Sequence, residues 1–264
     1  MRRIIVVGGG AAGMMAAIQA AEPGNSVLLL EKNEKLGKKL FITGKGRCNV
    51  TNDCDVENLL AHVVTNPKFL YSAFYGFSSQ DMKQFLAERG LRLKTERGNR
   101  VFPVSDHSSD VIACLAKELS GRGVEVRLRE AVQELVLGEG AAETGDFQET
   151  SGQGPSSRVA AVRMVDGTVY EADAVIVATG GLSYPSTGSD GDGHRLATET
   201  GHRVTECTPA LVPFTSPDGW CPKLMGLSLK NVNVAIWDGK KKLYEEFGER
   251  LFTHFGVSGP AVLS

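Results

Sequence analysis

A glycine-rich turn near the N-terminus limits the fold of this chain more than any other feature. Residues 8–13 read GGGAAG and lie between a β-branched run at 4–7, which predicts a short buried strand, and a dense run of helix formers at 11–21. A second apolar strand is expected at 26–30. A strand, a helix and a strand in this order form a βαβ unit, whose crossover requires a parallel sheet. The predicted fold class is therefore α/β.

Gly8, Gly10 and Gly13 have the G-x-G-x-x-G spacing of a dinucleotide-binding turn. The first glycine makes the turn, the second lets the backbone approach a pyrophosphate, and the third lets helix and strand pack closely. The helix N-terminus adds partial positive charge where the phosphates would sit. Glu31 ends the second strand, where it can accept hydrogen bonds from ribose hydroxyls and would repel a 2′-phosphate. A glycine-rich turn of an unrelated α/β protein is the alternative, but it leaves the position of Glu31 to coincidence.

The rest of the chain alternates helical and strand-like patterns. Residues 56–90 have apolar side chains at helical spacing and predict a small helical insertion. One of its helices is expected to begin at the cap Ser78-Ser79, and a later helix at Ser108 or Ser109. A hairpin is expected at 94–100 and a strand at 124–128. They are followed by an antiparallel meander at 132–137, 159–165 and 168–171, with a mobile surface loop at 138–157. The last predicted elements are a buried strand at 174–178, a helix at about 194–200 with Asp192 as its cap, and strand-like alternation at 227–237 with a turn at 238–239.

The insertion and the meander help to decide whether the bound dinucleotide is NAD or FAD. A simple NAD-dependent dehydrogenase passes directly to a second βαβ unit, whereas this chain places helices and a meander before the strand that ends Ala178-Thr179-Gly180. In this respect the chain resembles the glutathione-reductase-type flavoproteins, in which a meander and a strand ending Ala-Thr-Gly accompany the FAD fingerprint. The resemblance favours FAD over NAD as the resident cofactor.

Four further motifs narrow the resemblance: GKKLFITGKGRCNVTN at 37–52, GNRVFP at 98–103, YPSTGSDGDG at 184–193 and FTHFGVSGP at 252–260. They are similar to successive motifs of one bacterial flavoprotein family, whose members are described as aminoacetone-oxidase-family or dehydro-bile-acid-reductase-like NAD(P)/FAD-dependent oxidoreductases. The similarity covers nearly the whole chain. Lys45 replaces a glycine of the family pattern, and His194 replaces a tyrosine.

The resemblance implies a glutathione-reductase-type FAD-binding Rossmann-like domain, with a parallel sheet, a β-meander and a helical insertion, and the start of a β-rich second domain. We expect the FAD-binding domain at 1–52 and 101–206, the helical and hairpin insertion at 53–100, and an incomplete β-rich substrate-side domain at 207–264. The family also has a C-terminal segment that re-enters the FAD domain. This sequence lacks it, so the chain is expected to be a fragment.

The cofactor-binding residues follow from the same resemblance. It implies contacts to the pyrophosphate from Gly8, Gly10, Ala11, Ala12 and Gly13, to the adenosine ribose from Glu31 and Lys32, to the adenine from the backbone of Val132, and close approach to the cofactor by Ala178, Thr179 and Gly180. The basic stretch 37–52 follows Glu31 in a chain that already has a pyrophosphate turn, so we interpret it as reaching the flavin end of FAD. The residues expected to act there are Gly46, by close backbone approach, and Arg47 and Asn49, by polar contacts.

Charge and cysteine content restrict the function classes. A formal net charge of -2 gives no long-range attraction to nucleic acid or anionic lipid. No segment has the roughly 20 apolar residues of a membrane span. The five cysteines form no C-x-x-C pair and indicate a reducing, cytoplasmic location, without a metal site. Cys48 is a candidate redox thiol beside Arg47, but a small residue packed beneath the flavin is the favoured interpretation.

We therefore expect an FAD-dependent oxidoreductase that acts on a small organic substrate. It would be a reductase with NAD(P)H as a diffusible electron donor, or an oxidase. The alternative is a non-catalytic flavin-binding module in RNA modification or redox sensing, which a dense basic face would favour. The sequence identifies neither the catalytic residues nor the oligomeric state.

Overall fold

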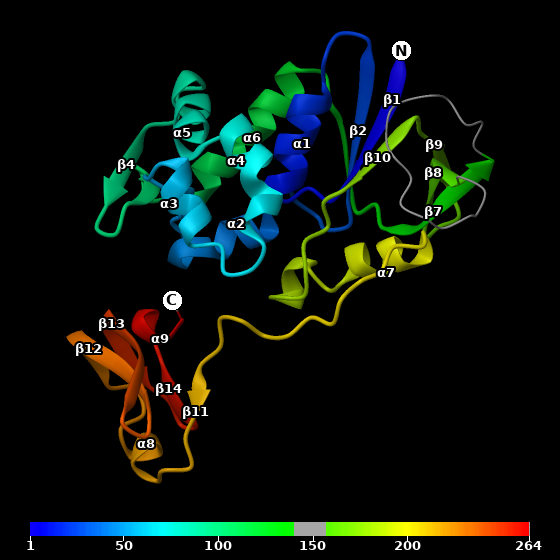
Figure 1. The fold of residues 1–264 in the computed structure, drawn as a ribbon. Helices are drawn as coiled ribbons and strands as arrows, with labels where there is room; N and C mark the ends of the chain where they lie inside the picture. Colours follow the sequence, from blue (N-terminus) through cyan, green and yellow to red (C-terminus); the bar gives the residue numbers. More distant parts are fainter. Residues whose placement is uncertain (140–156, 264) are drawn as a thin grey trace. The chain divides into compact units, whose positions relative to one another are not determined.

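The structure, a computed structural model, describes residues 1–139 and 157–263. The chain divides into two units, Met1–Val204 and Thr205–Ser264, which are described separately below (Figure 1). The surface loop expected at 138–157 falls almost entirely outside the described residues. The finer division of the first unit into 1–52 with 101–206 and 53–100 stays a prediction.

A four-stranded parallel sheet forms the centre of the first unit, in the order β10-β1-β2-β6 (Figure 1). Its strands are β1 (Arg2–Val7), β2 (Asn25–Glu31), β6 (Glu125–Leu128) and β10 (Ala174–Val177). On β1, Val7 pairs with Leu30 of β2 and with Val177 of β10, so the three strands end at the same edge of the sheet. This arrangement confirms the predicted parallel α/β fold.

Alternating side chains of β1 enter two different cores. Val6 packs with Met14 of α1 (Ala11–Ala20) and Leu115 of α6 (Ser108–Gly121) on one face of the sheet. Ile5 and Val7 belong to the other core, with side chains of the meander and of α7 (Asp192–Glu199). Successive side chains of a strand point to opposite faces, so a continuous apolar run fits a sheet that is covered on both sides.

The meander is antiparallel, as predicted, in the order β7-β8-β9. It comprises β7 (Val132–Glu139), β8 (Ser157–Met164) and β9 (Val169–Glu171). The expected turn between the last two strands is present, because Gly167 has φ +88° and its N–H donates to the Met164 carbonyl oxygen at 3.0 Å.

The segment between β2 and α6 contains the helices expected at 56–90 and the hairpin expected at 94–100. The helices are α3 (Val56–Ala61), the 3-10 turn η2 (Pro67–Leu70), α4 (Tyr71–Gly76) and α5 (Ser79–Glu88), and the hairpin strands are β4 (Leu93–Glu96) and β5 (Arg100–Pro103). Before them, within 37–52, lie α2 (Lys38–Ile42), the 3-10 turn η1 (Thr43–Gly46) and β3 (Thr51–Asn52). Ser78 caps α5 in a reciprocal capping box with Asp81, which confirms the predicted cap. The helix expected to begin at Ser108 or Ser109 is α6, which begins at Ser108. Only its predicted cap was wrong, because His107 holds the cap position and the buried Ser108 hydroxyl donates to the Phe41 carbonyl oxygen at 2.8 Å.

Asp53 joins the start of the insertion to α5 and β4. Lys83, Gln80 and Thr95 donate to its carboxylate at 2.7–2.8 Å, and these bonds, that of Lys83 foremost, lower the pKa of Asp53 from 3.8 to about 2. A depressed carboxyl pKa stabilises the fold above the ordinary pKa, and this contribution is lost as the pH falls through the folded value.

We therefore expect Asp53→Asn to lower the free energy of unfolding by a constant amount at pH 5–7. The difference from the wild type should shrink as the pH falls from about 4 to about 2, as measured by urea unfolding at each pH. Glu22→Gln, at an exposed carboxyl, serves as the control and should show no such trend. A difference that stays constant down to pH 2 would contradict the assignment.

The second unit contains an antiparallel sheet in the order β11-β14-β13-β12. Its elements are β11 (Phe214–Thr215), α8 (Trp220–Lys223), β12 (Ser228–Asp238), β13 (Lys241–Phe252), β14 (Gly256–Ser258) and α9 (Pro260–Leu263). The strand predicted at 227–237 is β12, and the turn to β13 is at Gly239, with φ +56°. In the described parts of both units, no helix has the length and apolar content that a membrane crossing needs.

Candidate functional site

In the turn between β1 and α1, a side chain at Gly8 or Gly13 would collide with the backbone, whereas Gly10 borders empty space. Gly8 has φ +109°, and a Cβ there would lie 2.5 Å from the Ala178 carbonyl oxygen. A Cβ at Gly13 would lie 1.7 Å from the carbonyl oxygen of Gly8, so turn and helix pack together only without a side chain. A Cβ at Gly10 would meet no atom within 4 Å. Packing therefore requires Gly8 and Gly13, whereas Gly10 borders open space.

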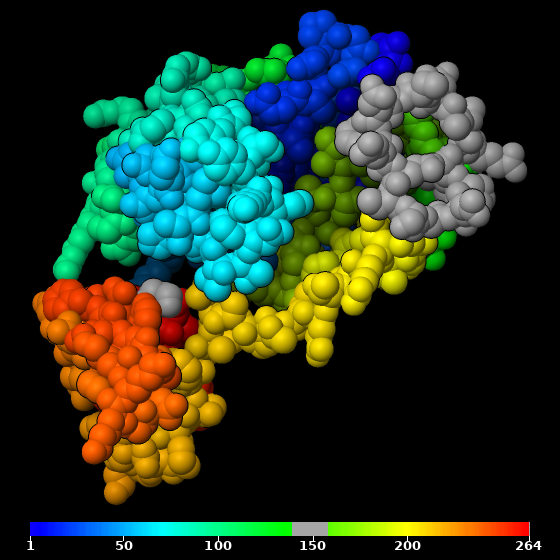
Figure 2. All heavy atoms as spheres, viewed as in Figure 1, coloured from blue at the N-terminus to red at the C-terminus, as the bar shows by residue number. Residues whose placement is uncertain are grey.

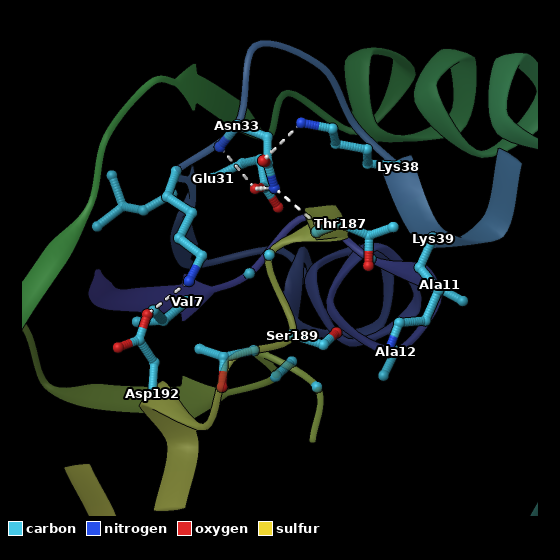
Figure 3. A pocket seen from close by; sticks show the side chains of 18 of the residues that line it. Val7, Ala11, Ala12, Glu31, Asn33, Lys38, Lys39, Thr187, Ser189 and Asp192 are labelled. Carbon is cyan, nitrogen blue, oxygen red and sulfur yellow. Dashed lines mark hydrogen bonds and ion pairs between the residues drawn. The ribbon is translucent and has the colours of Figure 1, made fainter. Parts of the chain in front are cut away.

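A cavity of about 300 Å³ lies beside this turn, at the carboxyl ends of β1, β2 and β10 (Figure 3). In open α/β sheets, ligands bind at this edge. The predicted site residues that line the cavity are Gly8, Gly10, Ala11, Ala12, Glu31, Lys32, Val132, Ala178, Thr179 and Gly180. The structure thus brings together the turn, the end of β2, the start of the meander and the end of β10.

The first turn of α1 contributes backbone N–H groups to the cavity wall. The first N–H groups of a helix have no partner within the helix and carry partial positive charge. Ala11 and Ala12 supply two of them, and both residues have small side chains that leave the backbone accessible. An anionic group in the cavity can therefore accept hydrogen bonds from this end of the helix.

Glu31 is buried, with 7% of its surface exposed, and its carboxylate holds the turn in place. Oε2 accepts from the Gly9 N–H at 2.6 Å, and Oε1 accepts from the Asn33 N–H at 2.8 Å and from Asn33 Nδ2 at 2.7 Å. An ionised carboxylate has about four acceptor positions. Three of these acceptor positions are occupied, so the Glu31 carboxylate retains about one acceptor position for a ligand hydroxyl.

Lys32 lines the cavity, but its charge is already paired. Its Nζ contacts Asp190 and Asp192, each at 2.7 Å (Figure 3 draws the Asp192 pair). Partial burial lowers the pKa of Lys32, but the hydrogen bonds to these two carboxylates outweigh burial and raise it overall. The bond to Lys32 in turn lowers the pKa of Asp190. Among the lysines of the cavity wall, Lys38 and Lys39 are less completely neutralised.

Residues 183–190 form a strap along the cavity, a position that no local sequence pattern predicted. Thr187, Gly188 and Ser189 of the strap line the cavity, and the strap contains the 3-10 turn η3 (Pro185–Thr187). Asp190 of the strap accepts from Lys32, and Ser183 accepts from Lys39 at 3.2 Å. The strap leads into α7, which lies at the surface of the first unit in Figure 2, in yellow. These contacts join segments about 150 residues apart, which local patterns do not reveal.

Other residues of the wall were also missed. The polar ones are Asn33, Lys38, Lys39, Thr43, Glu130 and Asp192, and the apolar ones are Val7, Leu30, Leu40 and Leu196. Asp192 was expected to cap α7, but Gly191 holds the cap position and Asp192 begins the helix. Its carboxylate pairs with Lys32 and, at 3.3 Å, with Arg195. The glycine-rich family motif at 184–193 was the one available signal for this part of the wall.

Four predicted residues lie outside the cavity lining. Gly13 packs beneath the turn, as described above, and Gly46 and Asn49 do not contact the cavity. The guanidinium of Arg47 is bound by Asp106 at 2.7 Å and by Glu96, and its Cζ lies 4.1 Å from the centre of the Phe102 ring. These contacts tie the stretch 43–49 to the hairpin. The expected contacts of Gly46, Arg47 and Asn49 with the flavin stay predictions.

Cys48 is a core residue. Its side chain is completely buried in the core that includes Val6 and Leu29. Burial raises the pKa of the thiol, and a hydrogen bond to Thr43 only partly offsets this. The arrangement favours a packed thiol over a reactive thiolate.

Comparison with known proteins adds a family and several relatives. Residues 2–258 match the model of the family described as HI0933-like protein Rossmann domain. A 3-dehydro-bile acid delta(4,6)-reductase from Clostridium scindens is 33% identical over 261 residues, which are 98% of this chain and 58% of that protein. A ribosomal RNA dihydrouridine synthase from Haemophilus influenzae is 31% identical over 262 residues, which are 98% of this chain and 59% of that protein.

Solved structures support the fold. The open conformation of a flavocytochrome c3 fumarate reductase superposes with a TM-score of 0.52 and 21% identity, over 87% of this chain and 47% of that chain. This likeness shows a shared fold. The chain spans less than two thirds of the length of the curated relatives it matches.

Proposed function

The chain belongs to the family of HI0933-like Rossmann-domain proteins, and from this membership we propose that it is the FAD-binding part of a reductase. The observation that carries the proposal is the convergence of the α1 N-terminus and Glu31 on one cavity. A pyrophosphate fits the first, and a ribose hydroxyl fits the second.

The residues present fit FAD in three respects. Gly10 leaves open space where the backbone must approach the pyrophosphate. Ala11 and Ala12 add unpaired N–H groups without bulky side chains. Glu31 keeps about one acceptor position in the cavity wall. We propose further that Lys32 acts mainly by holding the strap through Asp190 and the start of α7 through Asp192, and contacts the ribose only if a ligand displaces one of these carboxylates.

The names of the two relatives suggest the type of reaction. A 3-dehydro-bile acid with double bonds at positions 4 and 6 has alkenes conjugated to a ketone, and dihydrouridine is uridine with the double bond beside a ring carbonyl saturated. Both names describe reduction of a carbon–carbon double bond activated by a carbonyl. We propose the same reaction class here: hydride adds to one alkene carbon and a proton to the other, with NAD(P)H supplying the two electrons. Bound FAD supplies redox chemistry that can link these two reactants.

A small molecule is the substrate we propose, in preference to RNA. The net charge of -2 provides no attraction to a polyanion. An oxidase is the competing activity, with dioxygen as the electron acceptor. The five free cysteines are compatible with the reducing cytoplasm that we propose as the location.

The test uses the purified full-length protein. We expect a bound-flavin absorption spectrum that NADH or NADPH bleaches without oxygen, and whose colour returns when a 3-oxo-4-ene steroid is added. Absence of bound flavin would overturn the central proposal. A flavin that neither nucleotide bleaches would overturn the reductase assignment, and recovery with uridine-containing RNA but not the steroid would overturn the small-molecule assignment.

A further inference from the structure

Asn33 lies where the end of β2 meets the strap, close to the centre of the contacts drawn in Figure 3. Its Nδ2 donates to Glu31 Oε1 at 2.7 Å and to the Thr187 carbonyl oxygen at 3.2 Å. Its Oδ1 accepts from Lys38 Nζ at 3.2 Å. One amide thus contacts an acidic residue, the strap and a lysine, and all three partners line the cavity.

The strap is fitted closely to this amide. Gly188 has φ +97°, and a Cβ there would lie 2.6 Å from Asn33 Nδ2. The strap can therefore pass Asn33 at this distance only with glycine at position 188. The backbone of Asn33 is held as well, because its carbonyl oxygen accepts from the Arg129 N–H at 3.0 Å. The surrounding chain thus fixes both partners of this contact, the Asn33 side-chain amide and the strap backbone at 187–188.

We infer that Asn33 is a positioning residue for cofactor binding, because it fixes the Glu31 carboxylate and couples it to the strap. This inference rests on the proposed binding of FAD in the cavity. The backbone N–H and the side-chain amide of Asn33 both donate to Oε1, and the Gly9 N–H donates to Oε2. The acceptor position that remains for a ligand is therefore on Oε2 and has a defined direction. Without Asn33 Nδ2, Glu31 loses one of three donors and the strap loses its hydrogen bond to Asn33, so near the end of β2 the strap keeps the Lys32–Asp190 pair. A carboxylate that must be ordered at the moment of binding binds its ligand less tightly.

Placing a charge on the side chain at position 33 tests this role more sharply than removing the side chain does. An aspartate has nearly the shape of asparagine but would set a second carboxylate against Glu31 Oε1. Two carboxylates within hydrogen-bonding distance can share one proton, which raises the apparent pKa of the pair above that of a single carboxyl group. The charged groups around position 33 are Glu31 on β2, Lys38 on α2 with its partner Glu34, Lys32 with Asp190 and Asp192, and Arg129 and Glu130 before the meander.

The experiment measures the Kd of the full-length apoprotein for FAD by quenching of flavin fluorescence at pH 5.5–8. We expect Asn33→Ala to weaken binding about tenfold at all pH values, the loss of one well-placed hydrogen bond to a charged group. Asn33→Asp should bind weakly at pH 8 and recover toward pH 5.5, because a shared proton restores a donor to Glu31. The wild type should change little over this range.

Asn25→Asp is the matched control. Its amide donates to the Ala20 carbonyl oxygen at 2.9 Å, away from the cavity, so the same change of charge should leave the pH profile of FAD binding flat. A wild type that binds no FAD would overturn the proposed function. A wild type that binds FAD, with both Asn33 variants binding as tightly at every pH, would overturn the role of Asn33 and leave the proposed function standing.

Discussion

Gly10→Ala is expected to lower the affinity for FAD about 100-fold while the protein remains folded. The added methyl group meets no protein atom within 4 Å, and Gly10 has an extended backbone, φ -78° and ψ -173°, that alanine adopts freely. The methyl group would instead occupy the space through which the backbone approaches the pyrophosphate. A 100-fold loss corresponds to about 2.7 kcal/mol of binding free energy.

Two measurements separate this effect from misfolding. FAD titration of the apoprotein gives the Kd, and urea unfolding of the same apoprotein gives the free energy of unfolding, which should change by less than about 0.5 kcal/mol. Gly121→Ala, at the end of α6 and also without neighbours within 4 Å, should alter neither Kd nor folding by much. An FAD affinity within threefold of the wild type would show that the pyrophosphate does not lie against Gly10.

Gly13→Ala is expected to have the opposite profile, with a large loss of stability. Its Cβ would lie 1.7 Å from the Gly8 carbonyl oxygen, which is backbone and cannot rotate away. Either α1 or the turn must shift, and α1 supplies Met14, Ala17 and Ile18 to the core. Overpacking of this kind costs about 3 kcal/mol or more when the backbone must move.

The urea midpoint of the apoprotein measures this loss without any cofactor. Gly121→Ala is again the control, because it adds the same methyl group to a helix where space exists and should be neutral or slightly stabilising. A Gly13→Ala protein with the wild-type midpoint would mean that helix and turn do not pack as closely as described. Together, the two glycine variants distinguish the residue that shapes the fold from the one that admits the ligand.

Predictions that depended on neighbours in sequence succeeded. The β1-α1-β2 unit, the meander and the capping box of Ser78 with Asp81 all follow from patterns a few residues long. Predictions failed where a polar side chain has a distant partner. Ser108 or Ser109 was expected to cap α6, but His107 holds the cap position and the Ser108 hydroxyl contacts Phe41, 67 residues earlier. Asp192 was expected to cap α7, but its carboxylate pairs with Lys32, 160 positions away.

By itself the sequence determined the parallel sheet, the glycine turn and the acidic residue at the end of β2, because each is encoded by spacing along one short segment. Only the tertiary structure decided how the charged groups pair. Lys32 and Arg47 have the charge that an anionic cofactor would attract, but carboxylates from the strap, α7 and the hairpin region already neutralise them. Asn33 became significant for the same reason: hydrogen bonds are formed between groups that folding brings within about 3 Å, whatever their separation in the chain.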